Sequence, residues 1–99
     1  IARLVQDSMH QIESSMGVNL ASDSLGYNRL ASHVRYMIAR ARKGERASLD
    51  MQDYARTSFP KPYEVAKMVC RYMEKRLGIP LAPEETGFLA IHIQRVMQQ

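Results

Sequence analysis

Helical spacing of apolar residues is the feature that most constrains the fold of this chain. The clearest example lies in residues 62–77, where apolar side chains recur at i, i+3, i+4, i+7 and i+11: Ala66, Val69, Cys70, Met73 and Leu77. No stretch alternates with period two under β-branched enrichment, and no Asn-Gly hairpin dipeptide occurs. The 99 residues are enough for one domain. We therefore predict an all-α fold, a compact bundle of about five helices.

Glycine and proline residues divide the chain into the expected helices. Gly17, Gly44 and Gly78 each follow a helical pattern and can adopt the left-handed conformation that ends a helix. Phe59–Pro62 is expected to form a rigid corner, because each proline disfavours helical geometry in the residue before it. The predicted helices span residues 1–16, 23–42, 48–54, 62–77 and 83–95.

The second predicted helix contains the first histidine of interest. Ser22 or Asp23 can serve as its N-cap. His33 lies at the border of the apolar stripe, where partial exposure is expected, so a structural and a functional role are equally open. The stripe that we expect to be buried consists of Leu25, Leu30, Val34, Met37, Ile38 and Ala41.

The last predicted helix contains the second histidine. Pro83 suits a first helical position because its missing N–H would be unpaired there, and Glu84 and Glu85 favour the positive helix end. The rest is apolar around most of its circumference, so the helix should be buried or join an interface. His92 is either a hydrogen-bonded core residue or a working group, because its neighbours on the helix are expected to be covered: Phe88, Leu89 and Val96.

Composition limits the possible settings and partners. No run approaches the roughly 18 apolar residues of a membrane span, and no signal peptide is recognisable. The single Cys70 excludes an internal disulfide, fits a reducing, cytoplasmic setting, and is expected to be a small core residue. The chain opens on Ile1 already in helical pattern, so we expect residues 1–99 to be one domain of a longer protein.

The net charge of +4 raises nucleic acid as a partner. Its source is a cluster opposed only by Glu45: Arg35, Arg40, Arg42, Lys43 and Arg46. Cations at a helix C-terminus also complement the helix dipole, which is the simpler interpretation. No aromatic residues alternate with the basic ones, and no helix-turn-helix or zinc spacing is visible. A small nucleic-acid-binding domain that uses the Arg35–Arg46 cluster stays as the alternative function.

Enzyme signatures are absent from the sequence. There is no phosphate-binding glycine loop, no G-x-S-x-G and no H-E-x-x-H. Glu85 precedes His92 by two helical turns, too far to share a metal ion with it, and no Glu-x-x-His pair accompanies His33. We expect no enzymatic activity, no cofactor and no metal. The two histidines remain, and neutral imidazole is a nucleophile that can carry a phosphoryl group.

Two segments resemble the PTS-regulation domain (PRD), the regulatory module of sugar-operon antiterminators and related activators controlled by the bacterial phosphotransferase system. They are Asn28–Arg40, with His33 followed by apolar residues and an arginine, and Glu84–Ile93, where Glu85, Thr86 and Gly87 are followed by four apolar residues and His92. The family's pattern for the second segment is a glutamate, a hydrophobic residue, a glycine, hydrophobic residues and a histidine. Tyr63–Ala66 is also similar to the family's pattern. The resemblance spans nearly the whole chain.

The resemblance implies a five-helix bundle that forms a homodimer. His33 and His92 would be phosphorylated by the HPr phosphocarrier or a sugar-specific transporter component of the phosphotransferase system, although Ser32 replaces the acidic residue that usually precedes the first histidine. RNA or DNA would bind only through a domain missing from this chain. A phosphate that adds roughly −1.5 to −2 charges needs cationic neighbours, and the candidates are Arg29, Arg35, Arg40 and Arg95.

Overall fold

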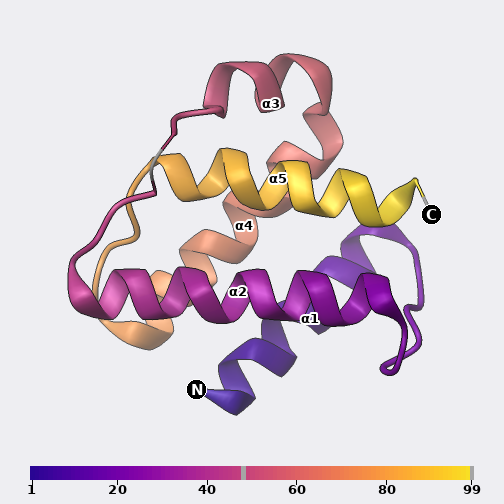
Figure 1. Cartoon of the computed structure of the whole chain (residues 1–99), viewed down its shortest axis with the longest axis horizontal. Coiled ribbons are helices and arrows are strands. Elements are labelled where there is room, and N and C mark those ends of the chain that lie inside the picture. The colour runs from indigo at the N-terminus through magenta and orange to yellow at the C-terminus, as the bar shows by residue number, and fades with distance from the viewer. Residues whose placement is uncertain (48, 99) are drawn as a thin grey trace.

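The computed structural model describes residues 1–47 and 49–98, and over these the chain forms helices and no strand. The helices are α1 (Ala2–Met16), α2 (Leu25–Lys43), α3 (Gln52–Ser58), α4 (Pro60–Leu77) and α5 (Glu84–Met97). Figure 1 shows their arrangement. The predicted all-α bundle of five helices is confirmed.

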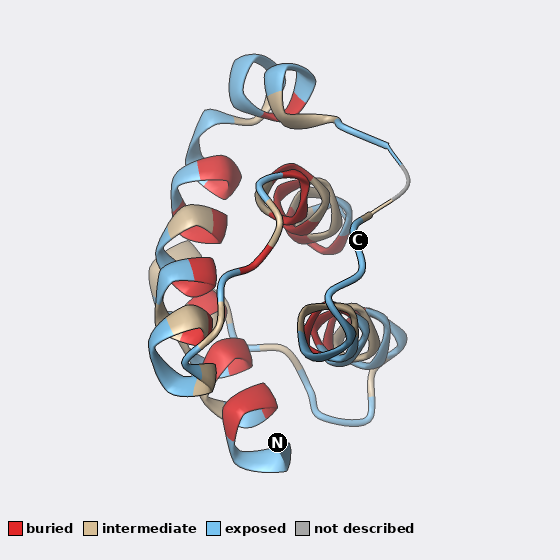
Figure 2. Ribbon diagram, turned by 90° about the vertical axis from the view of Figure 1, so that its left-hand side faces the viewer, coloured by how far each residue is buried: buried red, intermediate tan, exposed pale blue. Residues whose placement is uncertain are grey.

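The helix α5 is central to the packing, because it contacts α2, α3 and α4. It runs antiparallel to α2 and beside it, and α3 lies on the other side of α5 (Figure 1). α4 packs against α1 and α5. The buried faces of these helices point toward one another across the interior (Figure 2). The largest fully buried side chains of this core are Met9, Ile12, Leu30, Met37, Ile38, Met73, Leu89 and Ile93.

The predicted ends of three helices are confirmed. Gly17, Gly44 and Gly78 follow α1, α2 and α4 with φ of 70°, 72° and 71°. This left-handed conformation is strained for residues with a side chain, so glycine ends these helices sharply.

The start of α2 differs from the prediction. Its N-cap is Ser24, not Ser22 or Asp23, and the Ser24 side chain accepts a hydrogen bond from the Tyr27 backbone N–H at 3.1 Å. Leu25, predicted to be buried, is therefore the first helical residue and is 61% exposed. The rest of the predicted stripe faces the core, with Ala41 half-buried at its end.

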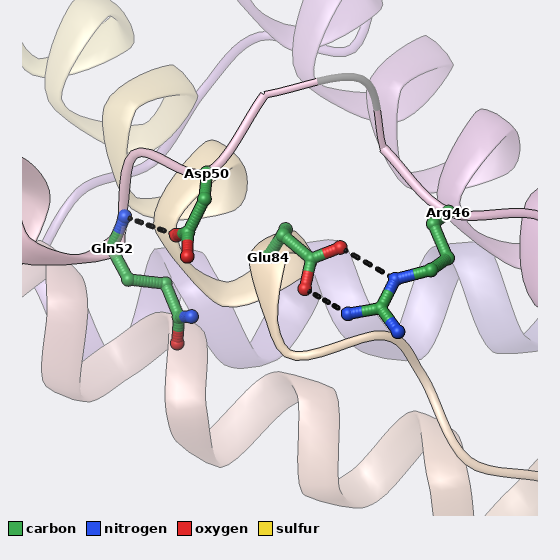
Figure 3. Close-up of polar contacts among 4 residues, drawn as sticks. All are labelled: Arg46, Asp50, Gln52 and Glu84. Carbon is green, nitrogen blue, oxygen red and sulfur yellow. Dashed lines mark hydrogen bonds and ion pairs between the residues drawn. The ribbon is translucent and has the colours of Figure 1, made fainter.

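The third helix also begins later than predicted. The predicted first residue, Ser48, lies outside the described residues, and α3 spans Gln52–Ser58 instead of ending at residue 54. The carboxylate of Asp50 accepts a hydrogen bond from the Gln52 backbone N–H at 3.0 Å (Figure 3), which occupies one of the unpaired donors of the first turn.

The prediction that Phe59–Pro62 forms a rigid corner is wrong for Pro60 and Pro62, because both lie in a helix. The chain turns at Phe59, where φ is −133° and ψ is 66°, and α4 starts directly at Pro60. Pro60 and Pro62 both lie in the first turn of α4, where an N–H would have no helical partner. The last helix begins one residue later than predicted, with Pro83 as the N-cap of α5.

Gly87 allows α3 to approach α5 closely. A Cβ atom on Gly87 would lie 2.9 Å from the backbone nitrogen of Gln52 and 3.0 Å from its Cα. Backbone atoms cannot move aside as the end of a flexible side chain can, so only glycine fits here. No described helix is long and apolar enough to cross a membrane.

Candidate functional site

The two histidines singled out in the sequence meet between α2 and α5. The rings of His33 and His92 are stacked, with their centroids 3.9 Å apart and their planes inclined by 27°. Both side chains are half-buried. The border position predicted for His33 is confirmed, whereas His92 is less covered than its apolar neighbours suggested.

A buried ion pair lies seven residues from this stack on both helices. Arg40 donates two hydrogen bonds of 2.7 Å to the carboxylate of Glu85. The Glu85 side chain is 1% exposed, while that of Arg40 is 26% exposed. Seven residues are nearly two helical turns. The antiparallel helices therefore present the ion pair and the histidine pair along one shared seam.

A second ion pair joins the loop after α2 to the start of α5. Arg46 donates hydrogen bonds of 3.0 Å and 2.6 Å to the carboxylate of Glu84 (Figure 3). The consecutive glutamates at the α5 N-terminus thus each bind one arginine. Two of the five cations in the basic cluster are neutralised in this way.

One cavity of about 370 Å³ opens beside the histidine stack, at the end of the seam opposite the ion pairs. Arg29 from the first half of α2 and Arg95 from the end of α5 line it. Among residues 1–47 and 49–98, neither arginine has a carboxylate partner. The other lining residues are Leu30, His33, Tyr36, His92, Val96 and Gln98.

A second cavity of about 400 Å³ touches the same two rings. It is lined by His33, Arg40, Arg46, Ala47, Phe88 and His92. Its two arginines are those that Glu85 and Glu84 already bind. The cations of the two cavities therefore differ: those of the first are unpaired among the described residues, and those of the second are not.

Burial and positive neighbours keep both imidazoles neutral. Burial, the adjacent His92 ring and the Arg40 guanidinium lower the pKa of His33 to about 3. Burial, Arg95 and Arg40 also lower the pKa of His92. A neutral imidazole has a lone pair on one ring nitrogen and can act as a nucleophile. The Nε2 atom of His33 is buried and has no hydrogen-bond partner among the described residues.

The structure brings together most, but not all, of the predicted site residues. Arg29 and Arg95 line the first cavity, and Arg40 lines the second. Arg35 is exposed on α2 and lines neither cavity, so its role stays a prediction. His10 is exposed on α1, as predicted.

Other site residues were missed. Sequence reasoning did not anticipate Glu85 as the partner of Arg40, although the spacing offered a signal. Arg40 follows His33, and His92 follows Glu85, by seven residues each. Tyr36 and Gln98 also line the first cavity, and no pattern in the sequence marks them.

Cys70 lines neither of the two cavities beside the histidines. Cys70 is buried, as predicted, and burial raises the pKa of its thiol to about 12, far from the range of a reactive thiolate. The carboxylate of Glu85 binds Arg40 rather than pointing to a shared ion. Within the described part of the chain, no group of three or more His, Cys, Asp or Glu side chains could hold a metal ion.

Relatives of this chain include antiterminator proteins. It is 27% identical over 101 residues to Protein GlcT of Staphylococcus haemolyticus, and the match covers 100% of this chain and 36% of that protein. It is 24% identical over 102 residues to transcription antiterminator LicT of Bacillus subtilis, covering 100% of this chain and 37% of that protein. The chain thus spans about a third of the length of these relatives.

Structural comparison and a family profile agree with these relatives. The crystal structure of GlcT CAT-PRDI superimposes with a TM-score of 0.84 at 22% identity, over 98% of this chain and 56% of that one, which shows a shared fold. The profile of the PRD domain matches residues 6–96. The chain therefore belongs to the PRD family, and the resemblance read from its sequence is confirmed.

Proposed function

We propose that this PRD is a regulatory phospho-acceptor and dimerisation domain of a transcriptional antiterminator or activator. His92 and His33 take phosphate from the HPr phosphocarrier or from a sugar-specific component of the phosphotransferase system. The names of relatives such as transcription antiterminator LicT support the regulatory setting. The domain carries the signal and is not itself an enzyme.

The observation that carries this proposal is the histidine stack beside two arginines that have no carboxylate partner among residues 1–47 and 49–98. His33 and His92 lie with their centroids 3.9 Å apart in a cavity that Arg29 and Arg95 also line. Structural histidines in a core need no cationic cavity beside them. A phosphohistidine does, because its phosphate carries roughly −1.5 to −2 charges and several strong hydrogen-bond acceptors.

The chemistry follows from the neutral state of the rings. The lone pair of a His92 or His33 nitrogen attacks the phosphorus of a phosphorylated donor histidine, and the phosphorus–nitrogen bond of the donor breaks. The donor imidazole is released, and the phosphoryl group stays on the acceptor ring. Arg29 and Arg95, which line the same cavity as the rings, would bind its oxygens. Arg40 is held by Glu85 and would contribute only the electrostatic effect of its positive charge.

Dimerisation would convert this charge change into a signal. The outer side of α2 exposes Leu25 and Tyr36, at 61% and 64%, and Tyr36 also lines the cavity. A homodimer that uses this side of α2 would place the phosphate at or near its interface. Phosphorylation would then shift the packing or the population of the dimer, and a coupled effector domain outside this chain would respond. RNA or DNA binding belongs to that domain.

Phosphotransfer tests the proposal directly. The domain is incubated with phosphorylated HPr, and in parallel with a phosphorylated sugar-specific transporter component. Acid-labile phosphate is then measured by intact mass on wild type, His33→Gln and His92→Gln, with His10→Gln as the exposed control. We expect label on wild type and His10→Gln, and a reduced rate or extent in the other two variants. No label from either donor would refute the proposal.

The alternative, direct nucleic-acid binding through the Arg35–Arg46 cluster, has less support. Arg40 and Arg46 are already paired with Glu85 and Glu84, which leaves Arg35, Arg42 and Lys43. Binding by phosphate contacts weakens steeply with added salt. A titration of fluorescent RNA and DNA at two salt concentrations distinguishes the two functions. Tight, salt-sensitive binding by this domain alone would favour the alternative.

A further inference from the structure

The shared position of the two histidines limits how they can be used together. We infer that the domain carries one phosphate at a time, so that phosphorylation of His33 and phosphorylation of His92 exclude each other. This inference rests on the proposed phospho-acceptor function and concerns the regulation of the same site. It predicts a single binary signal from each domain, although two acceptors are present.

The first reason is space. The two rings are in van der Waals contact, with centroids 3.9 Å apart, and both line the same two cavities. A phosphoryl group on one ring therefore enters a cavity that the other ring also lines. Nε2 of His33 is buried as well, so a donor reaches it only if the packing around His33 opens. A phosphate already held on His92 by the neighbouring arginines opposes that opening.

The second reason is charge. In the cavity of about 370 Å³, the cations are Arg29 and Arg95, and two guanidiniums balance one phosphate of roughly −1.5 to −2 charges. In the other cavity, Arg40 and Arg46 are occupied by Glu85 and Glu84. Because the two ring centroids are 3.9 Å apart, a second phosphate would bring its charge close to the first, and among the described residues the further cations of these cavities are already bound by carboxylates. Like charges at such a distance strongly disfavour each other.

Neither reason depends on which histidine reacts first. In each transfer the lone pair of one acceptor nitrogen displaces the donor histidine from phosphorus, one phosphorus–nitrogen bond forms and one breaks. Once either ring holds the group, the space and the two cations are used. The remaining histidine then stays an unmodified neighbour of the phosphohistidine, and it becomes available again when the phosphate is removed.

Phosphate stoichiometry tests the inference. The 99-residue chain is treated with a large excess of regenerated phospho-donor until its mass stops changing, for wild type, His33→Gln and His92→Gln. Circular dichroism confirms that each variant is folded. We expect one phosphate per chain on wild type and label on each single variant, which shows two acceptors that share one place.

The other outcomes separate the inference from the proposed function. Two phosphates on wild type would overturn the inference and leave the phospho-acceptor function intact. One phosphate on wild type with none on a folded variant would also overturn it, because only one histidine would then be an acceptor. No phosphate on any protein would remove the proposed function and the inference with it.

A charge variant tests the cause. Glu84→Gln removes the charge that binds Arg46 in the second cavity without changing a histidine, and the Arg46 side chain is 67% exposed. We expect a doubly phosphorylated fraction to appear in this variant and not in the matched control Asp53→Asn, which breaks an exposed ion pair on α3. Equal stoichiometry in both variants would overturn charge balance as the cause of exclusion.

Discussion

Acidification from pH 7 to pH 5 should destabilise this domain through its histidine stack. In the folded protein, burial, His92 and Arg40 lower the pKa of His33 to about 3. In the unfolded chain a histidine binds its proton near pH 6.5. Between these values the unfolded state holds more protons than the folded state, so stability decreases as pH decreases. The contribution of His33 is fully present above about pH 6.5 and is lost as pH falls toward about 3.

The size of the effect follows from the two pKa values. At pH 5 the unfolded state gains about 2 kcal/mol from protonating His33, while the folded state gains almost nothing. His92, whose pKa is also lowered, acts in the same direction. Most carboxylates titrate below this range, so the change in unfolding free energy between pH 7 and pH 5 comes mainly from the histidines.

Urea denaturation at pH 7, 6 and 5 measures this effect. For wild type we expect the free energy of unfolding to fall by at least about 2 kcal/mol across the window. His33→Gln should lose about 2 kcal/mol of that decrease, whereas His10→Gln, changed at an exposed position on α1, should follow wild type. A decrease as steep in His33→Gln as in wild type would show that the stack does not hold His33 neutral.

Three further predictions concern other contacts. Gly87→Ala should lower the free energy of unfolding by about 1–3 kcal/mol in urea denaturation, because the new Cβ would meet the α3 backbone at 2.9 Å. Arg40→Met should cost about 3–5 kcal/mol in the same assay, because it leaves the buried Glu85 charge without a partner. The matched Arg46→Met should cost far less, since the Arg46 side chain is 67% exposed and water reaches this pair, and equal costs would contradict that difference in exposure. The Cys70 thiol should react with a thiol reagent only as fast as the protein unfolds, because burial raises its pKa to about 12; labelling of the native protein at the rate of a free thiol would contradict this.

Much of the secondary structure could be predicted because its causes are local. Apolar side chains every three or four residues define the buried face of α4, and Gly78 ends that helix through its own left-handed φ of 71°. The same local rules failed where a choice depended on a distant contact. α3 starts at Gln52, whose backbone lies against Gly87, 35 positions later in the chain, where a Cβ atom would be 2.9 Å from the Gln52 nitrogen.

The residues of the candidate site could likewise be predicted only where local sequence determines them. The sequence by itself determined that His33 and His92 are the unusual residues, since each interrupts or borders an apolar helical face. Only the tertiary structure decided that the rings stack, that Glu85 occupies Arg40, and that Arg29 and Arg95 have no carboxylate partner among the described residues. The physical reason is the register between the two helices. Helical periodicity fixes which face a side chain is on, but the antiparallel register of α2 and α5 fixes which side chain it meets, and that register results from packing across the whole core.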